Sequence, residues 1–202
     1  MSVRSMLVAL TALAIATPLS LGAQNPSADF PAARRQFVAG QMRDAANTLL
    51  TASLLVRQEV GRSHDEIVGM KLYDAEGQLE KLAARLRAGA VGGVTALDRT
   101  LTQIDVLLAQ HHLQVASAGI AKPNNADLSA VAKDVDLAAF HFERSITLTG
   151  RTLSDEQSAA TNGARTLAKT IVSTKSIPAD APVVVATLEK LVLGTTVVAI
   201  AP

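Results

Sequence analysis

The chain has 202 residues, among them 19 basic and 18 acidic side chains, and it contains no cysteine. This near-neutral balance argues against nucleic acid or an anionic membrane as a partner, because both require a surplus of basic residues on one face. Without cysteine the chain cannot form disulfides, thiolate metal sites, covalently attached c-type haem or a lipid-modified cysteine.

The first predicted element is a secretory signal over residues 1–23. Arg4 supplies a positive charge, an apolar run follows, and small residues lead to Ala23, which is the order found in a cleavable signal. The apolar run is well short of the ~20 residues that span a bilayer, so no stable membrane insertion is expected after cleavage. We therefore expect an exported protein, periplasmic or extracellular, in which residues 24–28 link the signal to a single helical domain over 29–202.

The first two predicted helices are long and amphipathic. One runs from Asp29 to Gly61, and the next begins at a capping box formed by Ser63 and Glu66 and ends at Gly89. Apolar residues recur at steps of four and three, the period of one helical face. In the first helix this stripe consists of Val38, Met42, Ala45, Leu49, Ala52 and Val56.

The third and fourth predicted helices contain most of the histidines. The third starts at a capping signal on Thr95 and ends near Gly119, and the fourth runs from Asn125 or Asp127 to Thr149. The fourth helix is apolar on two sides. That pattern is typical of a helix at the centre of a bundle or at a contact with another subunit.

The last two predicted helices are less regular. Ser154 and Gln157 form a capping box for the fifth helix, and the sixth starts after Pro178 and extends to about Leu193. Residues 194–202 favour strand as much as helix, because threonine and valine dominate their first half.

Helices joined by short connections predict an all-α, antiparallel up-and-down bundle of about six helices. A similar alanine-pair motif in 45–52 and 138–145 suggests two related three-helix units, although the downstream spacings differ.

One segment resembles part of a tetratricopeptide repeat. Gly40, Met42, Ala45, Leu49 and Ala52 fall at the offsets of the second half of such a repeat. The resemblance implies a helical hairpin with a break at Gly40. The first-half pattern and the closing proline are missing and no further copy follows, so we prefer an ordinary amphipathic helix.

The histidines are the candidate site residues. His111 and His112 lie on the third helix and His141 on the fourth, and none has a liganding residue three or four positions away. Adjacent histidines also diverge by about 100° around a helix, so no metal site is predicted. Binding of haem or a metal by His111 or His112 together with His141 is the alternative, and haem fits it because haem needs only one ligand per helix. Because aromatic residues make up only 2% of the chain, no cofactor is expected.

A polar seam accompanies the stripe of the third helix. Asp98, Asp105 and His112 recur every seven residues, about 10 Å apart along the axis, which is too far for hydrogen bonds among themselves.

No catalytic motif occurs in the chain, and we expect a non-enzymatic binding or interaction module. Its predicted interaction face is the second apolar side of the fourth helix, formed by Leu137, Phe140 and Leu148. A second copy of the chain or another envelope protein is the expected partner. Convergence of the three histidines would favour the cofactor alternative instead.

Overall fold

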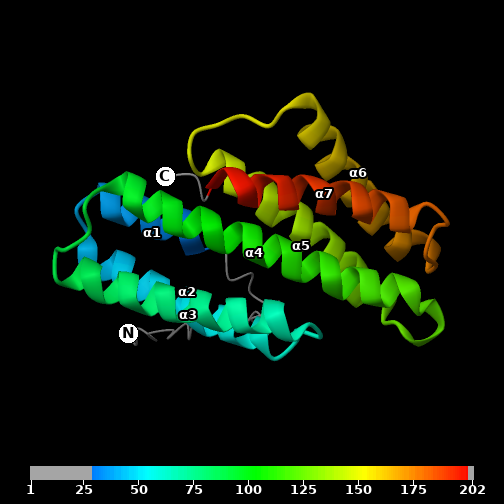
Figure 1. Ribbon diagram of the computed structural model, residues 1–202, viewed down its shortest axis with the longest axis horizontal. Helices are drawn as coiled ribbons and strands as arrows, with labels where there is room; N and C mark the ends of the chain where they lie inside the picture. The colour runs from blue at the N-terminus through cyan, green and yellow to red at the C-terminus, as the bar shows by residue number, and fades with distance from the viewer. Residues whose placement is uncertain (1–28, 200–202) are drawn as a thin grey trace, which may run out of the picture.

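Seven α-helices make up most of residues 29–199, the part of the chain that this computed structural model describes (Figure 1). They are α1 (Asp29–Val38), α2 (Met42–Val60), α3 (Glu66–Arg87), α4 (Val94–Ala121), α5 (Leu128–Thr147), α6 (Asp155–Thr174) and α7 (Ala181–Ala199), with a 3-10 turn, η2 (Pro123–Asn125), between α4 and α5. Since 29–199 contain no strand, the prediction of an all-α bundle is confirmed. The predicted signal and linker lie outside the described residues.

Helix α4 is shared by two hydrophobic cores. Its N-terminal half packs with α1, α2 and α3 around residues such as Leu49, Leu79 and Leu101. Its C-terminal half packs with α5, α6 and α7 around Leu113 and Phe142. Figure 1 shows α4 crossing most of the molecule, with α2 and α3 on one side and α6 and α7 on the other. At 28 residues, α4 is about 42 Å long, enough to serve both cores.

The prediction of one continuous helix over 29–61 is wrong, because the chain turns at Gly40. This glycine has a φ of +76°, in the left-handed region that glycine adopts without strain. The backbone N–H of Gln41 donates to the carbonyl of Gln36 at 2.8 Å, which is the long-range bond of a Schellman C-cap. Helix α1 then packs on α2, and Phe30 enters the N-terminal core. The break lies where the tetratricopeptide resemblance implies one.

Two predicted helix starts are displaced by two residues. Helix α3 is capped by Asp65 instead of Ser63, because the Asp65 carboxylate accepts hydrogen bonds from two backbone N–H groups of the first turn. A carboxylate there also interacts favourably with the helix dipole. Helix α4 begins after Gly93 and has no side-chain cap, so the capping signal at Thr95 is wrong.

The later helices follow their local signals more closely. Asp127 caps α5, and Ser154 and Gln157 form the complete predicted capping box of α6. Helix α6 passes Gly163 without a break. Helix α7 continues to Ala199, so the β-prone residues after Leu193 are helical as far as the structure describes them.

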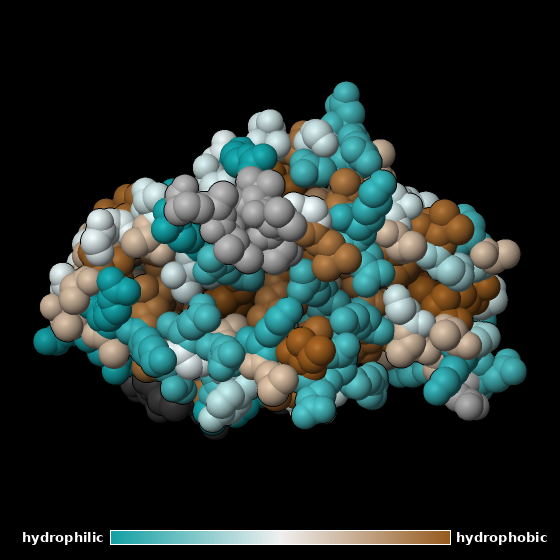
Figure 2. All heavy atoms as spheres, in the orientation of Figure 1, coloured by the Kyte–Doolittle hydropathy of each residue, from teal (hydrophilic) through white to brown (hydrophobic). Residues whose placement is uncertain are grey.

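The surface of the molecule is mixed. In Figure 2 hydrophilic side chains cover much of the visible face, and hydrophobic ones appear between them as separate patches. Within residues 29–199, none of the helices combines the length and the hydropathy that crossing a membrane requires.

Candidate functional site

The three histidines of α4 and α5 meet in one buried cluster. His111 and His112 come from α4 and His141 from α5, and all three are fully buried. The ring centroids of His111 and His112 lie 5.1 Å apart, and those of His112 and His141 lie 5.4 Å apart with 21° between the ring planes. The sequence left open whether these side chains converge, and in the structure they do.

Two buried aspartates hold the rings of His112 and His141 through reciprocal hydrogen bonds. His112 of α4 bonds through Nδ1 to Asp134 of α5 at 2.8 Å. His141 of α5 bonds through Nδ1 to Asp105 of α4 at 3.0 Å. The two helices therefore exchange equivalent histidine–aspartate bonds, as antiparallel helices related by a local two-fold axis would.

This exchange follows from one spacing that occurs in both helices. Asp105 precedes His112 by seven residues, and Asp134 precedes His141 by seven residues. Seven residues are about two turns, so each pair lies on one helix face. When the helices pack antiparallel, each aspartate comes opposite the histidine of the other helix. The sequence interpretation recognised this spacing on α4 only, and it therefore missed Asp134.

Each of these aspartates is also bound by an arginine. Arg144 of α5 donates to Asp105 from Nε at 3.1 Å and from Nη2 at 2.9 Å. Arg62, in the loop between α2 and α3, donates from Nη2 to the two oxygens of Asp134 at 3.0 and 2.8 Å. The site thus contains two Arg–Asp–His units, which meet where the two imidazole rings stack. Sequence reasoning identified neither arginine.

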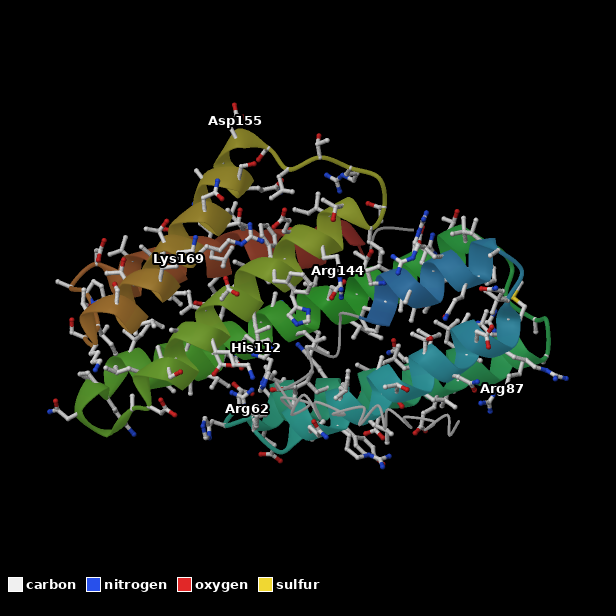
Figure 3. The ribbon with its side chains drawn as sticks, turned by 180° about the vertical axis from the view of Figure 1, so that it is seen from behind. Arg62, Arg87, His112, Arg144, Asp155 and Lys169 are labelled. Atoms are coloured by element: carbon white, nitrogen blue, oxygen red, sulfur yellow. The ribbon has the colours of Figure 1, made fainter. Side chains whose placement is uncertain are left out.

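The two units differ in their access to solvent. Arg144, 8% exposed, lies near the ring faces of Phe30 and Phe140, at 5.3 and 5.0 Å from their centroids. The side chain of Arg62 is 39% exposed. We call the group with Arg144 the sealed unit and the group with Arg62 the open unit. Figure 3 shows His112 near the middle of the molecule, with Arg62 close to it and Arg144 farther along α5.

Burial keeps the stacked histidines uncharged. It lowers the pKa of His141 to about 4, although the bond to Asp105 opposes the shift, and it also lowers the pKa of His112. Because Nδ1 of each ring faces a carboxylate, the single proton of the neutral ring belongs on Nδ1. Each Nε2 then has a bare lone pair, and in neither ring does Nε2 have a hydrogen-bond partner among the described residues.

Glu59, near the end of α2, adds a third carboxylate next to the open unit. Its Oε2 lies 3.0 Å from His111 Nε2 and accepts a hydrogen bond from Arg62 Nη1 at 2.8 Å. Burial by itself would raise the pKa of Glu59. The hydrogen bond with His111 and the electrostatic attraction of the Arg62 guanidinium outweigh burial and lower that pKa to about 2. Glu59 is therefore ionised near neutral pH.

Glu59, His111 and His112 form a set of potential metal ligands. One ligand atom from each residue lies within 4.8 Å of the other two. We expected adjacent histidines to diverge too far to share an ion, and this geometric expectation does not hold. That expectation took into account only the angle of about 100° at which adjacent side chains leave the helix. The rings extend beyond the backbone and turn toward each other, and the third ligand comes from α2.

The donor atoms define the chemistry of this set. Two imidazole nitrogens and one carboxylate oxygen are typical ligands of zinc and related transition metals, with a further position left for water. The Nδ1 of His112, the ring nitrogen that would not bind the metal, is hydrogen-bonded to Asp134. A carboxylate that accepts the second ring N–H of a liganding histidine fixes its tautomer and orientation.

The same geometry suits haem less well. The rings of His112 and His141 stack on each other, so no space remains for a porphyrin held between them. Two surface pockets border the network, of about 650 and 300 Å³. The larger pocket includes Arg62 and Asp134 and the smaller includes His111, but neither pocket is lined by His112 or His141.

The predicted interaction face is divided between interior and surface. Leu148 is 8% exposed and belongs to the N-terminal core. Leu137 and Phe140 are half-buried, and the ring of Phe140 contacts Arg144 and His141. The accessible part of the face therefore consists of Leu137 and the outer side of Phe140.

Fold and site together define an all-α protein with a histidine–carboxylate–arginine network between two helical cores. Comparisons with known protein families, with curated proteins and with solved structures find no significant match.

Proposed function

We propose that this protein is a non-enzymatic binding module that holds one divalent transition-metal ion at Glu59, His111 and His112. The observation that carries the proposal is the convergence of the three ligand atoms within 4.8 Å. The state of His112 supports it further. Its Nδ1 is engaged by Asp134, and its buried Nε2 has no hydrogen-bond partner in the described part of the chain.

The charge and the donors of the site favour a dication of the zinc class. Two carboxylates, of Glu59 and Asp134, and one guanidinium, of Arg62, lie around uncharged His112. This group has an excess of one negative charge, which a dication would reverse to one positive charge. Imidazole nitrogen binds Zn²⁺, Co²⁺, Ni²⁺ and Cu²⁺ in preference to Mg²⁺ or Ca²⁺. Three protein ligands with an open position suit reversible binding better than a closed structural site.

Export is part of the same proposal. The pattern over residues 1–23 supports delivery to the periplasm or the extracellular space. Binding of a protein partner through Leu137 and Phe140 is compatible with the metal site, because these half-buried side chains leave part of α5 accessible.

Metal titration of the purified chain tests the proposal. After treatment with a chelator, we expect one Zn²⁺ per chain in calorimetry and a visible absorption band when Co²⁺ occupies the same site. Glu59→Gln and His112→Gln should each abolish stoichiometric binding, since each removes a ligand. Asp134→Asn should weaken binding about 10–100-fold, because it removes the group that orients His112.

Two histidine variants serve as controls. His64→Gln removes an exposed histidine and tests for adventitious surface binding. His141→Gln removes a ring that stacks on His112 but lies outside the ligand set. Both variants should retain the one-to-one stoichiometry. The proposal is wrong if the wild-type chain binds no stoichiometric ion, or if folded Glu59→Gln and His112→Gln bind as tightly as the wild type.

A further inference from the structure

Arg62 occupies the carboxylate that a metal ion at the open unit would use. Its Nη1 donates to Glu59 Oε2 at 2.8 Å, and its Nη2 binds both oxygens of Asp134. The same Glu59 oxygen lies 3.0 Å from His111 Nε2. Arg62 and His111 together take up the two lone pairs of this oxygen, so a metal ion bound through Oε2 would compete with the guanidinium and be repelled by its charge.

The position of Arg62 allows its side chain to move away from Glu59 into solvent. It lies in the connection between α2 and α3, and 39% of its side chain is exposed. It also lines the pocket of about 650 Å³ that reaches Asp134. Rotation of the side chain toward solvent would free Glu59 and keep the guanidinium hydrated, while Asp134 keeps its hydrogen bond to His112.

Arg144 of the sealed unit, in contrast, is an arginine that cannot move into solvent. The side chain of Arg144 is 9% exposed, and it is bonded to fully buried Asp105 and has the rings of Phe30 and Phe140 close by. Arg144 cannot reach water without opening the core. The two arginines bind equivalent aspartates, but of the two only Arg62 can reach solvent by a rotation of its side chain.

We propose that Arg62 is a displaceable counter-cation that sets the metal affinity of the open unit, an inference that rests on the proposed function. In the metal-free protein it pairs with both Glu59 and Asp134. When the ion binds, Arg62 gives up Glu59 while Asp134 continues to orient His112. The site therefore exchanges one bound cation for another, so that its affinity is moderate and its metal can be released.

The affinity of Arg62 variants for Zn²⁺ tests this role, because a competitor and a supporting residue predict opposite signs. Arg62→Gln should bind Zn²⁺ at least about tenfold more tightly than the wild type, because the ion no longer has to displace a positively charged group from Glu59. It should also be less stable without metal. Arg62→Lys, which keeps the charge, should stay close to the wild type. Arg57→Gln is the matched control, because Arg57 is an exposed arginine of α2 that pairs with Glu76 outside the network.

A second measurement uses the wild-type chain and does not depend on a variant that folds. In NMR spectra, the Nε–H signal of Arg62 should shift and exchange faster with water when Zn²⁺ is added, while that of Arg144 stays protected. Equal or weaker binding by folded Arg62→Gln, or an Arg62 signal unchanged by saturating Zn²⁺, would overturn the role of Arg62 alone. If neither the wild type nor Arg62→Gln binds Zn²⁺, the proposed function itself fails.

Discussion

Replacement of Asp105 by asparagine should be among the most destabilising single changes in this protein. Asp105 is fully buried and accepts three hydrogen bonds, one from His141 at 3.0 Å and two from Arg144 at 2.9 and 3.1 Å. Asparagine has nearly the same size but no charge, and its amide group would place N–H donors against the donors of Arg144. Arg144 would then be left in the interior without a counter-charge.

The expected loss of unfolding free energy is that of a buried ion pair from which one partner is removed. Removal of one partner from a buried ion pair costs about 3–5 kcal/mol, a large share of the ~5–15 kcal/mol that stabilises a typical protein. With a urea dependence of about 2 kcal/mol per molar, a loss of about 4 kcal/mol lowers the unfolding midpoint by about 2 M. Urea unfolding at neutral pH, followed by far-ultraviolet circular dichroism, measures this shift.

Asp98→Asn is the matched control on the same helix. Among the residues that the structure describes, Asp98 accepts one hydrogen bond, from Arg34 Nε at 2.8 Å, and the side chain of Arg34 is 38% exposed. Asp98 itself is buried, but the partly exposed Arg34 stays hydrated when the pair is lost, so the change should cost only about 1–2 kcal/mol. Adding Arg144→Met to Asp105→Asn should recover part of the loss, because it removes the stranded charge. A loss below about 1 kcal/mol for Asp105→Asn, or one no greater than in Asp98→Asn, would refute this account of the sealed unit.

Two further predictions concern pH and packing. The protein should lose stability as pH falls from about 6.5 toward 4, because the pKa of His141 is about 4 when folded and near 6.5 when unfolded, so the unfolded chain takes up protons that the folded chain resists. Melting temperatures that stay constant across this window would contradict the burial of a neutral ring. Gly119→Ala should cost about 1–3 kcal/mol, because the new methyl group would overlap Val131 of α5. Gly77→Ala on α3 meets no atom within 4 Å, so it should stabilise the helix by roughly 0.5–1 kcal/mol; thermal unfolding of both variants checks the opposite signs.

The parts of the fold that the sequence predicted depend on local signals. Apolar periodicity defined the helices, and Asp127 and the Ser154–Gln157 box marked two of their starts correctly. Gly40 was misjudged because the apolar stripe continues across it. Periodicity does not report a turn when the next helix repeats the same pattern.

The site was harder to predict because its hydrogen bonds join residues that are far apart in the sequence. His111 and Glu59 are 52 residues apart, and Arg62 and Asp134 are 72 residues apart. No single helix contains a complete ligand set, so a search for ligands three or four residues apart could not find one. The repeated Asp–His spacing was the one visible signal. It becomes informative only when α4 and α5 are considered as an antiparallel pair.

The reciprocal histidine–aspartate bonds also determine how far α4 can slide along α5. The apolar contacts between these helices consist mainly of alanine, valine and isoleucine or leucine side chains, and a shift of one turn, about 5.4 Å, would bring similar side chains together again. The same shift would separate His112 from Asp134 and His141 from Asp105 at once, leaving both imidazole rings without these partners in the interior. Of the neighbouring registers that the aliphatic surfaces tolerate, the polar pairs therefore select one, and in that register His112 lies level with Glu59 of α2.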